Sequence, residues 1–269
     1  MGIKFRLIVM NFLQYAIWGS WLISLGAYLG GGLDFTGLQI GSFFATMGVA
    51  SLFMPAVMGI IADRWIPAQK LLGICHLVSG GFLIAAASQT AYGPLYSCML
   101  LSVMFYMPTI ALSNSVAYNA LDLARLDTVK HFPPIRVWGT VGFIAAMWFV
   151  DLTHIGGVQI KLTEWQLYVS AVLSFLLAVY SFSLPGCPVD RNVKARSWVD
   201  TLGLRAFTLF KEKRMAIFFV FSMLLGAALQ ITNAFGDSYI QSFGSMPQYA
   251  DSAIVKHSVI LLSLSQMSE

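Results

Sequence analysis

The sequence contains few charged residues. Only 10% of its 269 residues are Asp, Glu, Lys or Arg, and 58% are hydrophobic, whereas soluble domains carry about 25% charged residues. A soluble fold of this composition would have too few polar side chains to cover its surface. The composition therefore excludes a soluble globular protein and indicates a lipid bilayer as the surrounding medium.

Reactive and metal-binding motifs are also scarce. The three cysteines, Cys75, Cys98 and Cys187, lack CxxC or Cys/His spacing, and we interpret them as small, free apolar residues. The sequence has no paired catalytic carboxylates, nucleophile–His grouping or P-loop. We therefore expect neither an enzyme nor a bound metal or organic cofactor.

Long apolar runs, in contrast, are abundant. They cover residues 7–29, 38–62, 71–90, 95–121, 136–155, 164–185 and 214–243, and an eighth begins near 252 and continues to Glu269. A membrane-spanning helix needs about 20 residues, and the long runs lack the alternation of a membrane barrel. The sequence predicts an all-α membrane protein with seven complete spans and one interrupted span.

The positive charges indicate an orientation. If the spans alternate in direction, Lys161 and Lys256 lie on one side of the membrane. The other fourteen of the 16 Lys and Arg residues lie on the opposite side, at Lys4, Arg6, Arg64, Lys70, Arg125, Lys130, Arg136, Arg191, Lys194, Arg196, Arg205, Lys211, Lys213 and Arg214. The positive-inside rule places the N-terminus in the cytoplasm, which argues against a seven-helix receptor and against a cleaved signal peptide. This distribution accounts for the net charge of +4 without a nucleic-acid partner.

The longest connection suggests two groups of helices. Residues 186–213 are basic and mixed in composition, and we expect a surface helix near 198–210. Six spans, a cytoplasmic linker and further spans are typical of a transporter built from two six-helix halves. We therefore predict a complete six-helix half at 1–185, a linker at 186–213, and the start of a second half at 214–269.

Polar residues within spans are functional candidates because they are costly in lipid. Arg136, Thr140 and Phe143 share one face of the fifth span and offer a cation, a hydroxyl and an aromatic ring. Alternatively, Arg136 extends to the cytoplasmic interface and Phe143 meets lipid or a neighbouring helix. Gly139 and Gly142 lie on other faces, where we expect them to allow close helix packing.

The seventh and eighth spans carry two more polar pairs. Gln230 and Asn233 lie one turn apart and suit a ligand with several hydroxyls or a heterocyclic edge, or they bond between helices. Asp237 follows one turn later, where we expect it to be solvated. Gln266 and Glu269 form the third pair, and a carboxyl group within the membrane can take up and release a proton. Glu269 is also the last residue, so it could instead be an exposed chain end.

A cytoplasmic turn after the second span contains Gly59, Asp63 and Arg64. An Asp-Arg pair at this position can latch helix ends together in one of two domain arrangements. This turn resembles the loop signature of the major facilitator superfamily, although Trp65-Ile66-Pro67 depart from it.

More specifically, the sequence resembles bacterial nucleoside permeases of the nucleoside:proton symporter family over essentially its whole length. The matching segments include Trp18-Gly19-Ser20-Trp21, Phe53-Met54-Pro55-Ala56, Tyr106-Met107-Pro108-Thr109, residues 132–143, and Lys213-Arg214-Met215 continuing to Asn233. The resemblance implies import of nucleosides across the bacterial inner membrane, with a proton as coupling ion, by alternating access of two six-helix halves.

The resemblance also implies a substrate site near the middle of the membrane. By matching motif positions, its residues are Arg136, Thr140, Phe143, Gln230, Asn233, Gln266 and Glu269, with Glu269 also in proton coupling. Family members have about twelve spans, so we expect this chain alone not to perform coupled transport. The alternatives are a symporter for another small polar solute, such as a sugar, and a non-transporting fragment.

Overall fold

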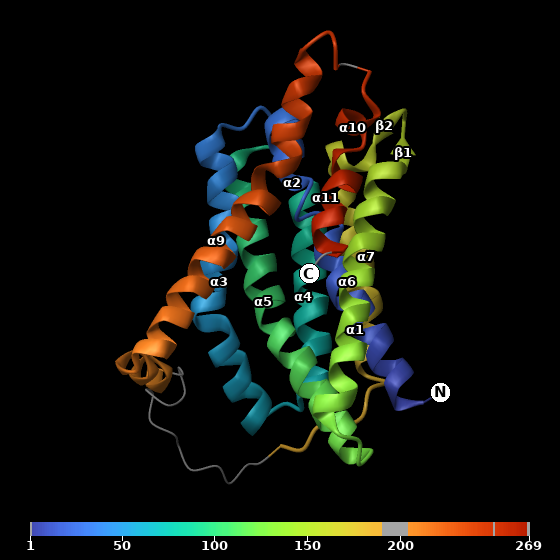
Figure 1. Cartoon of the computed structure of the whole chain (residues 1–269). Helices are drawn as coiled ribbons and strands as arrows, with labels where there is room; N and C mark the ends of the chain where they lie inside the picture. Colours follow the sequence, from blue (N-terminus) through green and yellow to red (C-terminus); the bar gives the residue numbers. More distant parts are fainter. Residues whose placement is uncertain (1, 190–203, 250, 268–269) are drawn as a thin grey trace.

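The computed structural model describes residues 2–189, 204–249 and 251–267, and it is predominantly helical (Figure 1). The first group of helices is α1 (Ile3–Gly19), α2 (Leu25–Ala27), the π-helix η1 (Tyr28–Gly32), α3 (Gly37–Arg64), α4 (Ala68–Ala87), α5 (Tyr92–Leu123), α6 (Thr128–Leu152) and α7 (Trp165–Ser181). A short antiparallel hairpin, β1 (His154–Ile155) and β2 (Val158–Gln159), and the 3-10 turn η2 (Ile160–Leu162) connect α6 to α7.

The second group begins after the linker. It consists of η3 (Leu204–Lys211), α9 (Lys213–Ser242), η4 (Phe243–Ser245), α10 (Ala253–Lys256) and α11 (Ser258–Met267). The expected surface helix near 198–210 falls partly outside the described residues, and its described part is the 3-10 helix η3. The predicted all-α fold is confirmed.

Most predicted spans correspond to single helices, but the first and the eighth are broken. Helix α1 ends at Gly19, where the Ser20 hydroxyl donates to the Ile17 carbonyl, and the chain turns before α2 and η1. The eighth run breaks at His257, between α10 and α11. Among the described residues, five helices are long and apolar enough to cross a membrane: α3, α4, α5, α6 and α9 continued to Ser245. The apolar helices α7 and α11 are shorter.

Glycines bring α1 and α6 together. A Cβ added at Gly142 of α6 would lie 2.2 Å from the Phe12 carbonyl oxygen, and one at Gly19 of α1 would lie 2.3 Å from the Phe143 carbonyl oxygen. Because these neighbours are backbone atoms, only glycine permits this spacing. The predicted packing role of Gly142 is confirmed.

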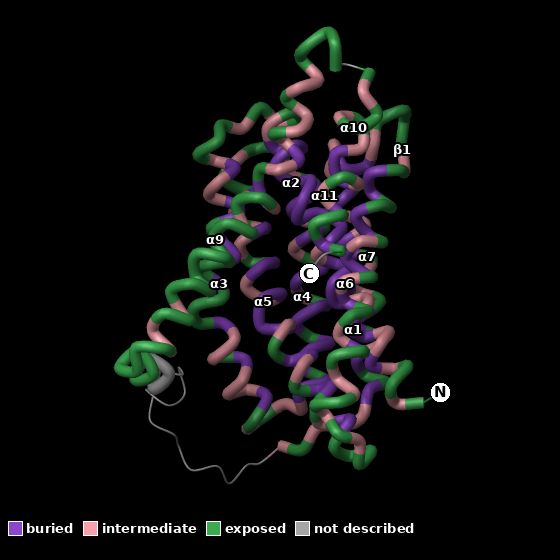
Figure 2. Tube along the Cα trace, in the orientation of Figure 1, coloured by how far each residue is buried: buried purple, intermediate pink, exposed green. Residues whose placement is uncertain are grey.

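The outer surface of the helix bundle is apolar. Leu52 and Val179 are 83% and 72% exposed, while Asn11, Gln14 and His76 are fully buried among the helices. Figure 2 shows the buried positions gathered along the interior of the first group of helices and the exposed ones on its outside. An apolar exterior of this kind is stable in contact with lipid. Because lipid offers no hydrogen bonds, buried polar groups need partners within the bundle.

The second group packs across the first. The rings of Phe44 in α3 and Phe235 in α9 lie 6.1 Å apart, and Trp148 of α6 donates to the Ser263 hydroxyl of α11 at 2.9 Å. Helix α9 also contacts α2 closely: a Cβ added at Gly26 would lie 2.7 Å from the Ala234 carbonyl oxygen. These contacts place a face of α9 opposite the first group of helices.

Candidate functional site

A cavity of about 560 Å³ lies where α9 meets the first group of helices. Its walls come from α1, α3, α5 and α9, and it is lined by Trp18, Gly41, Phe44, Ala45, Met47, Gly48, Ser51, Met107, Ala227, Gln230, Ile231, Ala234 and Phe235. The volume is within the range of small-molecule sites, and the lining combines apolar surface with a few polar groups, as such sites commonly do.

Two hydrogen-bond donors of the lining lack partners. Gln230 Nε2 and Trp18 Nε1 are both buried, and neither has a hydrogen-bond partner among the described residues. Leaving a buried donor unpaired costs about 1–3 kcal/mol. In this conformation both atoms are closed to solvent. Acceptor atoms of a ligand would pair with them, and so relieve that cost, once the two side chains turn toward the cavity, which makes these groups candidates for ligand contacts.

Aromatic rings surround Trp18. The Trp18 ring lies 5.9 Å from that of Tyr106 and meets the Phe143 ring edge to face at 6.4 Å. Phe143 is buried and does not itself line the cavity, so it supports Trp18 from behind. The arrangement fixes one large aromatic ring in the cavity wall, and aromatic rings are common partners of flat ligand rings.

A buried network of hydrogen bonds joins α1, which carries Trp18, to α4 and α5. Thr109 Oγ1 donates to the Tyr106 carbonyl oxygen and so accepts from Gln14 Nε2 at 2.7 Å. Gln14 Oε1 must then accept from His76 Nε2 at 2.8 Å, and the Tyr106 hydroxyl donates to the Gln14 carbonyl oxygen. The bonds join α1, α4 and α5, so Gln14 positions the helix that carries Trp18 and does not line the cavity.

The other predicted site residues in the described part of the chain do not line this cavity. The Arg136 guanidinium carbon sits 3.8 Å from the centre of the Tyr15 ring in α1, a cation–π contact. Thr140 and Asn233 are half-buried, and Gln266 in α11 is buried. Glu269 lies outside the described residues. The structure therefore places Gln230 and Trp18 in the lining of one cavity, with Phe143 packed against Trp18. A shared site with Arg136, Thr140, Asn233, Gln266 and Glu269 stays a prediction.

The predicted latch lies at the end of α3. Gly59, Asp63 and Arg64 occupy its last two turns, and the Asp63 side chain is exposed. Within the part of the chain that the structure describes, Asp63 and Arg64 form no ion pair. The latch function stays a prediction.

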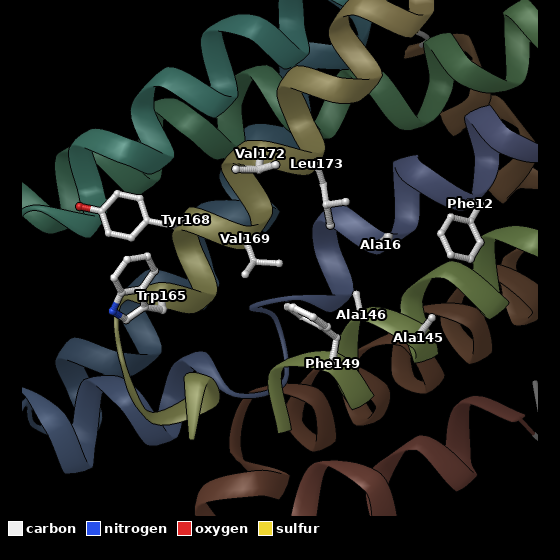
Figure 3. A pocket seen from close by; sticks show the side chains of 10 residues that line it. All are labelled: Phe12, Ala16, Ala145, Ala146, Phe149, Trp165, Tyr168, Val169, Val172 and Leu173. Atoms are coloured by element: carbon white, nitrogen blue, oxygen red, sulfur yellow. The ribbon is translucent and has the colours of Figure 1, made fainter. Parts of the chain in front are cut away.

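A second cavity, of about 440 Å³, lies between α1, α6 and α7 (Figure 3). It is lined by Phe12, Ala16, Ala145, Ala146, Phe149, Trp165, Tyr168, Val169, Val172 and Leu173. These side chains are hydrocarbon except for the indole nitrogen and the phenol oxygen. Such a lining offers too few polar groups for a hydrogen-bonding solute, so the Gln230 cavity is the better candidate.

The prediction that Asp237 is solvated is wrong. Its side chain is fully buried in α9, where it accepts from the Ser258 hydroxyl and, at 2.9 Å, from Gln241 Nε2. The sequence showed only that Asp237 lies near a helix end, and the cover supplied by Ser258 of α11 depends on tertiary packing.

Comparison with known proteins places the chain among transport proteins of one family. The family model described as Nucleoside H+ symporter matches residues 1–269. The xanthosine permease of Escherichia coli is 51% identical over the whole chain, and the nucleoside permease NupG of the same organism is 46% identical. The crystal structure of nucleoside transporter NupG superposes with a TM-score of 0.87 at 46% identity and covers the whole chain.

The match does not extend over the whole length of these relatives. The chain spans 63% of the xanthosine permease and of NupG, and 65% of the NupG crystal structure. The relatives are transporters, so the expectation that this chain is not an enzyme is confirmed. Over all of its residues, the chain belongs to the nucleoside H+ symporter family.

Proposed function

We propose that this chain takes part in proton-coupled import of nucleosides across the bacterial inner membrane, by alternating access of two groups of helices. The observation that carries the proposal is the pair of unpaired donors, Gln230 Nε2 and Trp18 Nε1, in the cavity between α9 and the first group. The family and the printed names of the relatives support the same activity.

A nucleoside suits the chemistry of this cavity. Its base has a flat face for the Trp18 ring and acceptor atoms on its edge for the two donors. Its ribose hydroxyls suit amide and guanidinium groups, and we assign this role to Asn233 of α9, Gln266 of α11 and Arg136 of α6. In the proposed cycle, Thr140 belongs to the substrate site, Phe143 holds the Trp18 ring in position, and Glu269 exchanges the coupling proton.

Binding to the purified chain tests the substrate class. We expect uridine or xanthosine to bind, measured by titration calorimetry, and hexoses neither to bind nor to compete. Gln230→Ala should weaken nucleoside binding about tenfold, because a hydrogen bond to a buried donor contributes about 1.4 kcal/mol. Gln248→Ala is the matched control, since Gln248 is an exposed amide outside the cavity. Equal affinities for Gln230→Ala and the control would exclude Gln230 from the site.

Uptake in cells that lack nucleoside transporters tests the activity. Carriers of this type enclose their substrate between two complete halves. If enclosure requires helices of both halves here as well, expression of residues 1–269 alone should give no protonophore-sensitive uridine uptake. Robust uptake that a protonophore abolishes would show that this length suffices for coupled transport. Competition by hexoses would favour the sugar alternative.

A further inference from the structure

A buried ionic cluster joins the two groups of helices at the end that carries the β1–β2 hairpin. Its members, which we call the outer cluster, are Asp151 at the end of α6, Lys161 in η2, Asp237 in α9, His257 between α10 and α11, and Ser258 at the start of α11. The first two belong to residues 1–185 and the other three to residues 214–269. Figure 1 shows α10 beside the β1–β2 hairpin at this end.

The bonds of the outer cluster cross between the two groups. Lys161 Nζ lies 2.6 Å from Asp151 Oδ1 and donates to Ser258 Oγ at 3.2 Å. Ser258 in turn donates to Asp237 Oδ1, and His257 Nδ1 lies 2.7 Å from Asp151 Oδ2. One chain of contacts therefore runs from His257 through Asp151, Lys161 and Ser258 to Asp237.

Neighbouring backbone carbonyls strengthen the same junction. Lys161 Nζ donates to the Lys256 carbonyl oxygen at 2.9 Å, and Gln159 Nε2 donates to that oxygen at 3.2 Å and to the Asp151 carbonyl oxygen at 2.9 Å. The loop between α6 and α7 is thus fastened directly to the loop before α11.

The charges of the outer cluster do not balance without a proton. Asp151 and Asp237 are fully buried and Lys161 is 1% exposed, so two carboxylates face one ammonium group in a region closed to water. An uncompensated buried charge costs several kcal/mol. Asp237 accepts one hydrogen bond on each oxygen, from Ser258 and from Gln241. One proton on His257, next to Asp151, makes the net charge of the cluster zero.

Other charged groups nearby leave this balance unchanged. Lys256 and Asp251 form an exposed ion pair with each other at 2.9 Å, with no net charge. His154 is exposed, and its ring nitrogen Nδ1 bonds to the carbonyl oxygen of Leu152. Histidine is the residue type whose charge ordinarily changes between pH 5 and 8, and His257 is 38% exposed and so can exchange a proton with water.

We propose that the outer cluster is a proton-binding latch: closing this side of the molecule takes up one proton, held on His257, and opening releases it. The inference rests on the proposed function, because alternating access requires the two groups to separate at this end. The closed state binds one proton more than the open state, so lower pH favours closure. The ratio of closed to open molecules changes by at most about tenfold per pH unit for one proton.

A distance measurement on the full chain in lipid nanodiscs tests the latch. Spin labels on Val158→Cys and Ile254→Cys, both exposed positions, report the separation of the hairpin from α10 in a background with the native cysteines replaced by Ala. We expect the ratio of the short-distance to the long-distance population to increase by up to about tenfold per pH unit as the pH falls from 8 to 6. A distance distribution independent of pH would overturn the proposal.

Three variants separate the latch from simple packing. His257→Gln should remove the pH dependence, and His154→Gln, the matched control, should keep it. Asp151→Asn removes the excess negative charge, so the short distance should dominate at every pH. Wild-type pH dependence in His257→Gln, or a long distance in a folded Asp151→Asn protein, would contradict the latch.

The measurement needs no nucleoside, so the two proposals can fail separately. Nucleoside binding with a pH-independent distance would reject the latch and leave the proposed function intact. A pH-dependent distance without nucleoside binding would support the latch and reject the proposed substrate.

Discussion

At Gly142, the distance between two helices depends on the absence of one methyl group. We predict that Gly142→Ala lowers the free energy of unfolding by about 1–3 kcal/mol, because the added Cβ would lie 2.2 Å from the Phe12 carbonyl oxygen. Thermal unfolding in detergent, followed by circular dichroism, measures the change.

The matched control for this prediction is Gly81→Ala in α4. A Cβ added at Gly81 meets nothing within 4 Å, and Ala has the higher helix propensity, so this variant should be as stable as the wild type or slightly more stable. Equal stability of the Gly142 and Gly81 variants would mean that α1 and α6 can move apart at little cost.

The residue types identified polar positions within the spans, but they did not identify the partners of those residues. Gln230 was identifiable as an amide in an apolar run, and the structure places it at a cavity with its Nε2 unpaired. Asp237, two turns further along α9, looked like a solvated carboxylate and is instead buried against Ser258. Asp151 and Lys161 gave no motif at all, because they are ten residues apart and meet only through the loop between α6 and α7.

At the scale of the elements, hydropathy located the helices but not their internal breaks. An apolar run is equally apolar whether it forms one helix or two, so the turn after Gly19 and the break at His257 did not alter the pattern. The structure also shows how two of the helices begin. Thr36 and Gln39 form a capping box at the start of α3, and Asp127 caps α6.

The cap of α6 gives a test at this scale. Asp127 accepts from the backbone N–H groups of Val129 at 2.9 Å and Lys130 at 3.4 Å. We expect Asp127→Ala to lower the free energy of unfolding by about 0.5–2 kcal/mol, because it leaves these donors without their cap. Asp127→Asn should retain most of the stability, since Asn caps about as well as Asp. Equal losses in both variants would point to the charge of Asp127 as the stabilising feature.

At the scale of the whole molecule, the orientation in the membrane can be tested by labelling. Val158 in the hairpin and Val129 at the start of α6 are 46% and 84% exposed, at opposite ends of α6. With the native cysteines replaced, we predict that a membrane-impermeant maleimide with access to the periplasm labels Val158→Cys, and labels Val129→Cys only after the inner membrane is permeabilised. The reason is that the basic loops remain in the cytoplasm.

The reverse labelling pattern would place the N-terminus outside and invalidate the positive-inside interpretation. Labelling of both positions from one side would contradict α6 as a membrane-spanning helix. A useful control is Leu38→Cys, which is 86% exposed and lies near the start of α3, on the same side as Val158 in the predicted topology.

By itself, the sequence determined the membrane environment, the approximate helix positions and the family, because these depend on composition, run length and long matched segments. Tertiary structure decided which polar groups meet. Gln230 reaches Trp18 across a cavity, and Asp151, Lys161 and Asp237 share one buried cluster, although they are far apart in the chain. The physical reason is that a charge or donor in lipid must find its partner on another helix. That partner is set by helix packing, which periodicity along one helix does not encode.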